Sequence, residues 1–312
     1  MNTKLNNLKV VSTGRYVPKK IVSNADLEKI VETSDEWIFT RTGIKSRHKA
    51  EGETTTELAY LAALNAIEKV GYDKSKLDLI IVATVTSDGR SPSTANLVQA
   101  KLGLNDKDLM CFDINAGCTG FIYALNIASQ LLNSGKYNSA LVIGSEILSK
   151  VTDYTDRGTC VLFGDGAGAM IIENTTEVKP AYLYTASKGD ENRALTVDKY
   201  ISMDGKKVYQ FAVGAMQDGI EKALQATNLT LDDLDIVIPH QANVRIIMSV
   251  AKTLNLDLDR FYVNIERYGN TSAASIIIAL DEYLETHSKP NQKILLVAFG
   301  AGFTWGSALL TL

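Results

Sequence analysis

The sequence predicts an α/β fold made of two related halves, about residues 1–173 and 174–312. Two observations support this prediction. Short apolar segments that resemble buried strands alternate with amphipathic helical segments, a pattern typical of sheets covered by helices on both faces. The order of these segments also repeats along the chain. Because no low-complexity linker separates the repeats, we expect the two halves to pack as one body.

The first repeated unit is a helix followed by a strand. In the N-terminal half, apolar residues recur at helical spacing over 58–67. This helix is expected to end at Gly71, because glycine is favoured just beyond helix C-termini. The apolar segment at 76–84 then reads as a strand. In the C-terminal half, a helix over 212–223 and a strand over 233–240 follow in the same order.

The second repeated unit is a strand, a turn of small residues and a helix. It spans 111–135, where the strand is CFDIN, and 261–285, where the strand is FYVNI. Superposing the two units places Cys118 opposite Asn270. In each half another strand follows, and a glycine-rich stretch then leads into a last strand. The polar, weakly periodic region 186–206 interrupts this order and is expected to be a surface excursion.

Composition narrows the class of protein. Hydrophobic residues make up 46% of the 312 residues and charged residues 22%, as in ordinary globular enzymes. A formal net charge of −4 gives no reason to expect nucleic acid or an anionic membrane as a partner. No apolar run approaches the roughly 18 to 20 residues that span a bilayer, and the N-terminus lacks a secretory signal pattern. Three cysteines without CxxC spacing argue against a disulfide framework. We therefore expect a cytoplasmic enzyme.

Cys118 is the best candidate for a nucleophile. It lies in a tight turn between a strand and a helix, flanked by Gly117 and Gly120. A helix N-terminus there would favour the thiolate, the reactive form of cysteine. Packing of a small buried residue is the alternative interpretation. Cys111 and Cys160 lie in apolar segments and are interpreted as packing residues.

His240 and Asn270 occupy comparable turns. His240 ends an apolar strand, at the edge where ligand-binding residues gather in α/β sheets, although a purely structural histidine fits equally well. Asn270, taken alone, also fits a helix N-cap. The three histidines are scattered and form no metal-binding motif, so no metal site is expected. Cys118, His240 and Asn270 together would suit thioester exchange and decarboxylation.

Four segments carry a resemblance to a known family. DINAGCTGF around Cys118, IPHQAN around His240, GNTSAAS around Asn270 and FGAGFTWG near the C-terminus resemble 3-oxoacyl-[acyl-carrier-protein] synthase III, in the same order and over essentially the whole chain. The resemblance implies the thiolase-like fold, with two duplicated halves in five layers, αβαβα. It also implies a homodimeric enzyme of type II fatty-acid synthesis.

The reaction that the resemblance implies is a decarboxylating condensation between a short acyl-CoA, with acetyl-CoA the expected donor, and malonyl-acyl carrier protein. Cys118 would take the acyl group while the backbone N–H groups of Cys118 and Ala301 hold the oxyanion. His240 and Asn270 would then stabilise the enolate that forms as carbon dioxide leaves. Acyl-CoA would be a substrate, and no permanently bound cofactor is expected.

The resemblance also implies two binding regions. Residues at the family's coenzyme A positions are Thr33, Trp37, Arg41, Arg157, Gly158 and Asn243. Trp37 and Arg157 are expected to sandwich the adenine. Residues expected to contact the carrier protein are Gln241, Ala242, Asn243, Val244, Arg245 and Lys252. A local basic patch there would suit an acidic carrier protein.

Three positions depart from the family's pattern. Ala301 stands where the family often has the middle of three glycines, and the region 186–206 is shorter than usual. Ser91 stands before Pro92, where the family often has Phe or Met. If Ser91 lines the acyl pocket, acyl groups longer than acetyl should be accepted. A related condensing enzyme of specialised, polyketide-type metabolism would share every catalytic residue and is the alternative function.

Overall fold

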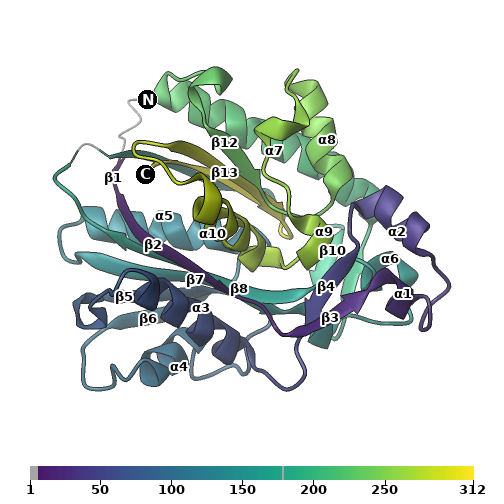
Figure 1. Ribbon diagram of the computed structural model, residues 1–312, viewed down its shortest axis with the longest axis horizontal. Coiled ribbons are helices and arrows are strands. Elements are labelled where there is room, and N and C mark those ends of the chain that lie inside the picture. The colour runs from purple at the N-terminus through teal and green to yellow at the C-terminus, as the bar shows by residue number, and fades with distance from the viewer. Residues whose placement is uncertain (1–5, 178) are drawn as a thin grey trace.

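Two five-stranded sheets organise the computed structural model, which describes residues 6–177 and 179–312 (Figure 1). The N-terminal sheet has the order β2-β8-β7-β5-β6, and the C-terminal sheet has the order β1-β9-β14-β13-β12. The first sheet consists of β2 (Lys9–Tyr16), β5 (Leu79–Ala83), β6 (Met110–Ile114), β7 (Ser139–Ile147) and β8 (Asp165–Glu173). The second consists of β1 (Asn6–Asn7), β9 (Pro180–Ser187), β12 (Ile236–Pro239), β13 (Lys293–Gly300) and β14 (Thr304–Thr311).

Four strands of one sheet, β2, β8, β7 and β5, correspond to β9, β14, β13 and β12 of the other. In the first, β5 pairs parallel with β6 and β7, and β8 lies antiparallel between β7 and β2. In the second, β12 pairs parallel with β13, and β14 lies antiparallel between β13 and β9. One short strand crosses the predicted division between the halves, because β1 comes from the N-terminus and pairs with β9.

The strand predicted at FYVNI is wrong. Within this segment the structure has only an isolated bridge from Phe261 to Val237, and helix α9 (Ile265–Tyr268) begins soon after. The side-chain oxygen of Gln241 accepts hydrogen bonds from the backbone N–H groups of Asn264 and Ile265, at 3.1 and 3.2 Å. These donors are therefore not free to continue a strand ladder, and the chain turns into the helix.

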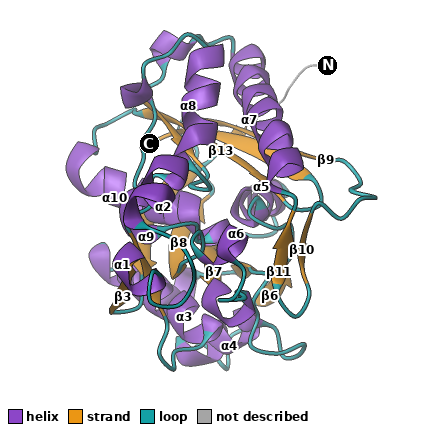
Figure 2. Cartoon of the chain, turned by 90° about the vertical axis from the view of Figure 1, so that its right-hand side faces the viewer, coloured by secondary structure: helices purple, strands orange, loops and turns teal. Residues whose placement is uncertain are grey.

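Helices complete five layers, as the resemblance implied (Figures 1 and 2). Helices α3 (Thr55–Lys69) and α4 (Thr94–Lys101) cover the outer face of the N-terminal sheet, and α7 (Gly205–Thr227) and α8 (Val244–Thr253) cover the outer face of the C-terminal sheet. Between the sheets lie α5 (Gly120–Asn133) and α10 (Ser275–His287). Both central helices are apolar over most of their circumference, because each packs against a sheet on two sides.

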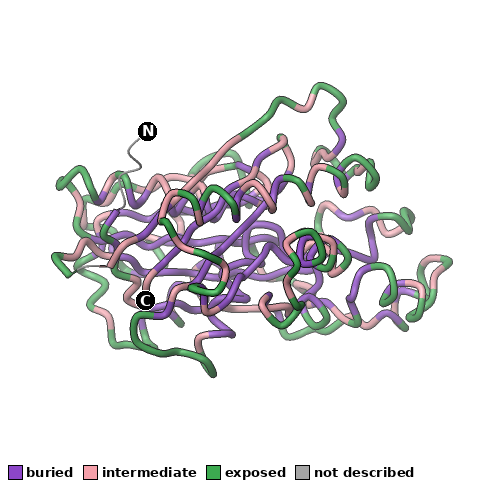
Figure 3. The backbone as a smooth tube through the Cα atoms, turned by 90° about the horizontal axis from the view of Figure 1, so that it is seen from above, coloured by how far each residue is buried: buried purple, intermediate pink, exposed green. Residues whose placement is uncertain are grey.

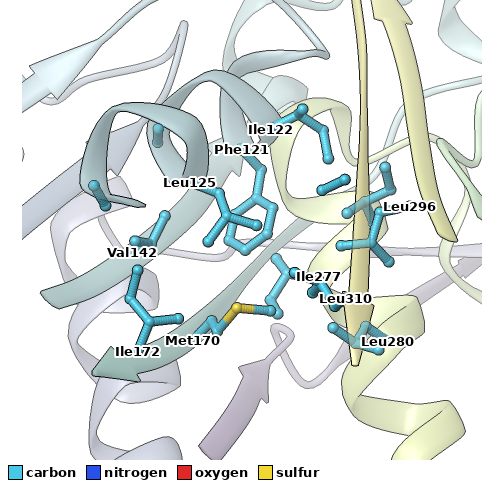
Figure 4. Close-up of a cluster of buried hydrophobic side chains, with 14 of the residues drawn as sticks. Phe121, Ile122, Leu125, Val142, Met170, Ile172, Ile277, Leu280, Leu296 and Leu310 are labelled. Atoms are coloured by element: carbon cyan, nitrogen blue, oxygen red, sulfur yellow. The ribbon is translucent and has the colours of Figure 1, made fainter. Parts of the chain in front are cut away.

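The main core fills the space between the sheets. Phe121 and Leu125 of α5 meet Ile277 and Leu280 of α10, and all four are buried (Figure 4). Side chains from both sheets close this cluster from either side: Val142, Met170, Ile172, Leu296 and Leu310. Buried residues accordingly run through the middle of the molecule, while the outer loops are exposed (Figure 3). The apolar sequence of α5 and α10 thus fixes the central layer.

Smaller elements stand at one end of the sheets. They are α1 (Asn24–Leu27), α2 (Asp35–Thr42), α6 (Arg157–Cys160), the ribbon of β3 (Lys20–Ser23) with β4 (Ser46–Lys49), and the hairpin of β10 (Leu195–Val197) with β11 (Ile201–Met203). No helix in the part of the chain that the structure describes is long and apolar enough to cross a membrane.

Glycine allows two close approaches that shape the interior at this end. A Cβ on Gly144 of β7 would lie 2.5 Å from the Ala273 carbonyl oxygen, in the short helix η5 (Ser272–Ala274). A Cβ on Gly300, where β13 ends, would lie 2.6 Å from the backbone nitrogen of Cys118. Real Cβ atoms do not come so near to backbone, so only glycine lets these segments pack. The turns that carry Cys118 and Asn270 are held against the two sheets in this way.

Candidate active site

One cavity of about 960 Å³ is lined by Cys118, His240 and Asn270 together. Each comes from a turn near the end of a strand or at the start of a helix. Cys118 lies between β6 and α5, His240 directly follows β12, and Asn270 precedes η5 and α10. Cys118 therefore meets His240 and Asn270, which lie more than a hundred positions further along the chain, because the turns of the two sheets line the same cavity.

Cys118 is reachable from the cavity and is held by backbone packing. Its neighbour Gly117 has a φ of +56°, a conformation that side chains other than glycine rarely adopt. Cys118 is partly exposed, and α5 begins two residues later at Gly120. The turn after β13 lies alongside: a Cβ on Gly117 would be 3.0 Å from the Ala301 nitrogen. The backbone nitrogens of Cys118 and Ala301 therefore lie in two turns that pack directly against each other beside the cavity.

The helix N-terminus expected to favour the Cys118 thiolate is present, but burial acts in the opposite direction. Burial raises the pKa of the Cys118 thiol to about 11, and the charge of Glu146 acts in the same direction. A helix N-terminus contributes at most about 2 kcal/mol, which corresponds to a pKa change of roughly 1.5. The N-terminus of α5 and the Ser272 side chain act against burial and favour the ionised thiol.

His240 is buried and neutral. Burial lowers the pKa of its ring to about 3. Its Nδ1 lies 2.6 Å from the Ser275 hydroxyl, which also accepts the backbone N–H of Gln241 at 3.3 Å. Ser275 can then donate its own proton to Nδ1, which leaves the ring proton on Nε2. Nε2 is buried and makes no hydrogen bond to any described residue, so a donor faces the cavity.

Asn270 lines the cavity and also makes a local turn contact, although the N-cap of η5 is Thr271 rather than Asn270. Its side-chain oxygen accepts the backbone N–H of Ser272 at 2.8 Å, as an asparagine at the start of a helix does. Its backbone is fixed on both sides, by bonds to Leu162 and Gly164. Because the side-chain oxygen is occupied locally, the amide NH₂ group is the part of Asn270 that remains to meet a ligand.

Four of the six expected coenzyme A residues line this cavity: Trp37, Arg41, Gly158 and Asn243. The guanidinium of Arg157 lies 4.9 Å from the centre of the Trp37 ring, and that of Arg41 lies 4.6 Å from it. A base between two planes needs about 7 Å, twice the roughly 3.5 Å contact distance. Arg157 is exposed and would have to swing away from Trp37 to admit the adenine.

Thr33 does not line the cavity. Its hydroxyl oxygen is buried and lacks a hydrogen-bond partner among the described residues.

The residues expected to contact the carrier protein differ in their exposure to solvent. Arg245 and Lys252 are exposed on α8. Gln241 requires a correction, because it is 1% exposed and its side chain binds the Pro239 and Tyr262 carbonyl oxygens. A buried side chain whose hydrogen bonds are all internal cannot contact a docking protein. Ala242 lines the cavity, while Val244 packs in the cluster around α2.

Ser91 does not line the cavity of its own chain, contrary to expectation. It is exposed, two residues before the N-cap of α4. The region 186–206 is largely exposed, as expected, but part of it has a further role. Its hairpin β10–β11 forms part of the cavity wall, and Ile201 is 5% exposed. The sequence did contain a signal for this hairpin: apolar and polar residues alternate in LTV and in ISM, as in strands with one buried face.

Several cavity residues were missed by sequence reasoning. Leu195, Val197, Ile201 and Met203 from the hairpin, with Phe299 from β13, give the cavity an apolar lining suited to a hydrocarbon chain. Ser272 of η5 lines the same cavity. Among residues 6–177 and 179–312, no group of three His, Cys, Asp or Glu side chains could hold a metal ion.

Sequence models of one family match two stretches of the chain. The description 3-Oxoacyl-[acyl-carrier-protein (ACP)] synthase III applies to residues 112–190, and that of its C-terminal part applies to 224–312. These stretches contain Cys118, His240 and Asn270.

Known proteins resemble the chain over its full length. It is 55% identical over 304 residues to a beta-ketoacyl-[acyl-carrier-protein] synthase III from Acholeplasma laidlawii, covering 97% of this chain and 98% of that one. The solved 3-oxoacyl-[acyl-carrier-protein] synthase III of Aquifex aeolicus superposes with a TM-score of 0.95 at 46% identity, covering 98% and 100%. A priming beta-ketosynthase of the R1128 polyketide pathway is more distant, with a TM-score of 0.91 at 32% identity, covering 99% and 97%. The chain belongs to the 3-oxoacyl-[acyl-carrier-protein] synthase III family.

Proposed function

We propose that this chain condenses a short acyl group, taken from an acyl-CoA such as acetyl-CoA, with malonyl-acyl carrier protein and so initiates fatty-acid synthesis. The products are 3-oxoacyl-acyl carrier protein, coenzyme A and carbon dioxide. Family membership makes the chain an acyltransferase. The observation that carries the assignment of residues is that Cys118, His240 and Asn270 line one cavity. The polyketide-type alternative is not favoured, because its representative is the more distant relative.

In the first half-reaction, the Cys118 sulfur attacks the thioester carbonyl of the acyl-CoA. Negative charge develops on the carbonyl oxygen, and the neighbouring N–H groups of Cys118 and Ala301 are the donors proposed to stabilise it. Collapse of this adduct releases coenzyme A and leaves the acyl group on the sulfur. Alanine at 301 supplies the same N–H as glycine would.

In the second half-reaction, His240 and Asn270 act on the malonyl thioester. As the carbon–carbon bond to the carboxylate breaks, the electron pair moves onto the thioester oxygen and forms an enolate. The Nε2–H of His240 and the amide NH₂ of Asn270 are proposed to donate to that oxygen. The enolate carbon then attacks the acyl-cysteine and expels the sulfur. A neutral imidazole suits this role, since it donates a hydrogen bond without giving up its proton.

Substrate binding is proposed at the two ends of the cavity. The coenzyme A nucleotide would stack on Trp37 after Arg157 moves aside, with Arg41 close to its phosphates. The acyl chain would lie against the apolar residues of β10 and β11. No permanently bound cofactor takes part in this reaction scheme.

The carrier protein is proposed to dock on one face of α8. Arg245, Met248 and Lys252 lie three and four residues apart and therefore share that face. All three are exposed, Met248 to 52%. An apolar side chain between two cations fits an acidic partner that also offers an apolar contact. Arg245 also lines the cavity, so a carrier protein on this face would stand at its mouth.

The chain is proposed to form a homodimer in which two copies meet at the β6 edge of the N-terminal sheet. Strand β6 ends this sheet and leaves backbone groups unpaired, and Met110 there is 41% exposed. Sedimentation equilibrium would test it, and a monomer would exclude it. Ser91 would line an acyl pocket only in such an assembly, from a second copy.

The three free cysteines suit a reducing compartment, and we place the enzyme in the cytoplasm.

The decisive experiment measures the mass of the intact protein, by mass spectrometry, after incubation with a panel of acyl-CoAs. The expected result is a mass increase equal to one acyl group, located on Cys118 by peptide mapping and removed by malonyl-acyl carrier protein. An acyl group on another residue, or an acyl-enzyme that malonyl-acyl carrier protein does not discharge, would overturn the proposed function.

A further inference from the structure

A buried carboxylate binds the segment of chain that leads into Asn270 and takes no part in the proposed reaction scheme. Glu282 of α10 is 8% exposed. Four side chains of segment 262–268 donate hydrogen bonds to it, at distances of 2.5 to 3.3 Å: Tyr262, Asn264, Arg267 and Tyr268. Tyr268, the nearest of them to Asn270 in the chain, donates to Oε2, while the other three share Oε1. One buried group therefore gathers the whole segment.

Glu282 accepts at both oxygens because it stays ionised. Burial acts against the charged form, but the hydrogen bonds from Tyr268 and Tyr262 and the charge of Arg267 lower the pKa of Glu282 below its ordinary value. An ionised carboxylate only accepts hydrogen bonds, and it does so at both oxygens. The donors on its two sides are thus satisfied at the same time.

The same segment is bound from its other side by the residue that follows His240. The Gln241 side chain accepts two backbone N–H groups of segment 262–268 and donates to one of its carbonyl oxygens, at 3.0 Å. The His240 ring is in turn bound to Ser275, which lies about two turns before Glu282 on α10. Segment 262–268 is therefore joined to both structures that hold His240.

Tyr268 is linked to Asn270 by a single residue that is closely packed. This residue is Gly269, which has a φ of +65°, and a Cβ there would lie 2.8 Å from the Leu162 carbonyl oxygen. The backbone N–H of Asn270 donates to that same oxygen, at 2.8 Å. Because the glycine has no free space in which to take up a movement, a displacement of Tyr268 is passed along the backbone to Asn270.

We propose that Glu282 is a positioning residue which, through Tyr268, fixes the Asn270 amide relative to the His240 ring. The inference rests on the proposed function, because it takes these two groups as the donors to the enolate. Two donors stabilise one oxygen only where both can lie about 3 Å from it. Glu282 does not line the cavity and acts through its neighbours. Decarboxylation should therefore depend on Glu282, whereas acylation of Cys118 should not.

The test compares the two half-reactions in Tyr268→Phe, which loses the hydroxyl and keeps the ring that stacks on His48. Release of labelled carbon dioxide from malonyl-acyl carrier protein, by a preformed acyl-enzyme, should slow about tenfold, since a displacement of about 1 Å can cost 100-fold. Acylation of Cys118 by acetyl-CoA should keep the wild-type rate. Glu282→Gln should slow the same step, because one amide oxygen cannot replace two acceptors that bind Tyr268 and Arg267 on opposite sides.

Two matched controls change the same groups elsewhere. Tyr72→Phe removes a hydroxyl that donates to a carboxylate in the N-terminal half, that of Glu173, at 2.9 Å. Asp281→Asn changes the neighbouring buried carboxylate of α10, which accepts hydrogen bonds from β2 and α3 instead. Neither Tyr72 nor Asp281 lines the cavity. Both variants should release carbon dioxide at the wild-type rate, and an Asp281→Asn that is as slow as Glu282→Gln would overturn the inference.

A double-mutant cycle separates positioning of Asn270 from a general loss of structure. If Tyr268 acts through the Asn270 amide, Tyr268→Phe should have little further effect on decarboxylation once Asn270 is replaced by alanine. Independent effects would multiply, so the double variant would be about tenfold slower than Asn270→Ala alone. A purely structural role of Tyr268 gives the second result.

Each remaining outcome has one meaning. An unchanged release of carbon dioxide in Tyr268→Phe, an equal slowing of both half-reactions, or multiplied effects in the cycle would overturn the inference. A wild type that releases no carbon dioxide from malonyl-acyl carrier protein, or that Asn270→Ala does not slow, would instead defeat the proposed function.

Discussion

The position of Cys118 is set by its neighbours along the chain, whereas the pKa of its thiol depends on residues that are distant in the sequence. Gly117 and the start of α5 fix the turn locally. The pKa of the thiol is raised by burial and by Glu146, which lies in another strand. Cys111 binds the Gln99 side chain within the N-terminal half, and Cys160 is buried in α6. Of the three cysteines, Cys118 is the one that lines the cavity.

We predict that Cys118→Ser abolishes acyl transfer from acyl-CoA. A serine hydroxyl is far harder to ionise than a thiol, and no described group beside it is a strong base. Intact mass after incubation with acetyl-CoA measures the transfer. Cys160→Ser is the control: it should still be acylated and should lose only stability, about 1 kcal/mol. Acylation at Cys160 in place of Cys118 would show that the nucleophile is wrongly assigned.

We predict that His240→Ala and Asn270→Ala slow malonyl decarboxylation more than they slow acylation of Cys118. Each substitution removes a donor aimed at the enolate, and one such donor contributes about 100- to 1,000-fold in rate. Release of labelled carbon dioxide from malonyl-acyl carrier protein, measured beside the acylation rate, separates the two steps. Equal losses in both half-reactions would contradict this division of roles.

We predict that the decarboxylation half-reaction shows no histidine titration between pH 5 and 9. Burial lowers the pKa of His240 to about 3, so the ring stays neutral through this range. Protonation would begin only as the pH approaches 3. The measurement is the rate of carbon dioxide release by a preformed acyl-enzyme across that range. A loss of rate centred near pH 6.5, the ordinary histidine pKa, would mean that the ring is more accessible to water than the structure indicates.

At the scale of elements, the site depends on the turn after β13. The turn runs beside the Cys118 turn at backbone-to-backbone distance, and Gly300 has no room for a side chain. The neighbouring Thr304 hydroxyl oxygen lies 2.9 and 3.0 Å from the Ala116 and Ala301 carbonyl oxygens, and can donate its proton to either of them. These bonds join the start of β14 to the nucleophile turn. The two proposed oxyanion donors are therefore positioned by one shared set of contacts.

We predict that Gly300→Ala lowers the acylation rate by about tenfold or more. The new Cβ would lie 2.6 Å from the Cys118 nitrogen, so the two turns must separate. A displacement of about 1 Å in a catalytic group can cost 100-fold. Gly189→Ala is the matched control, because a Cβ there meets nothing within 4 Å. If both variants acylate at the wild-type rate, the turn after β13 does not position the nucleophile.

At the scale of the whole molecule, charge is unevenly distributed. The chain carries a formal net charge of −4, yet the exposed face of α8 presents Arg245 and Lys252. Arg41 and Arg193 line the same cavity, and Arg157 stands beside it. Arg193 is paired with Asp198 of the same cavity, at 2.7 Å, so Arg41, Arg157 and Arg245 are the cations that anionic partners would meet there.

We predict that Arg245→Glu raises the KM for malonyl-acyl carrier protein about tenfold, or about 1.4 kcal/mol. Acyl-CoA loading should remain nearly unchanged, and the effect should shrink as salt is added. Lys101→Glu makes the same kind of charge change on α4, which covers the other sheet, and should have no such effect. An unchanged KM in Arg245→Glu would place the docking surface elsewhere.

The sequence by itself determined the repeated strands and helices, the family, and the three residues that meet in the cavity. Periodicity, capping glycines and short motifs depend on residues that are close together in the chain, so they can be recognised before the fold is known. The tertiary structure alone decided which faces of these elements meet. Gln241 looked available to a partner and is buried, while the hairpin at 195–203 looked like surface and lines the cavity. The turn around Cys118 was expected to favour the thiolate, whereas burial raises the pKa of the thiol. Burial could not be foreseen, because it depends on atoms that only the fold brings near.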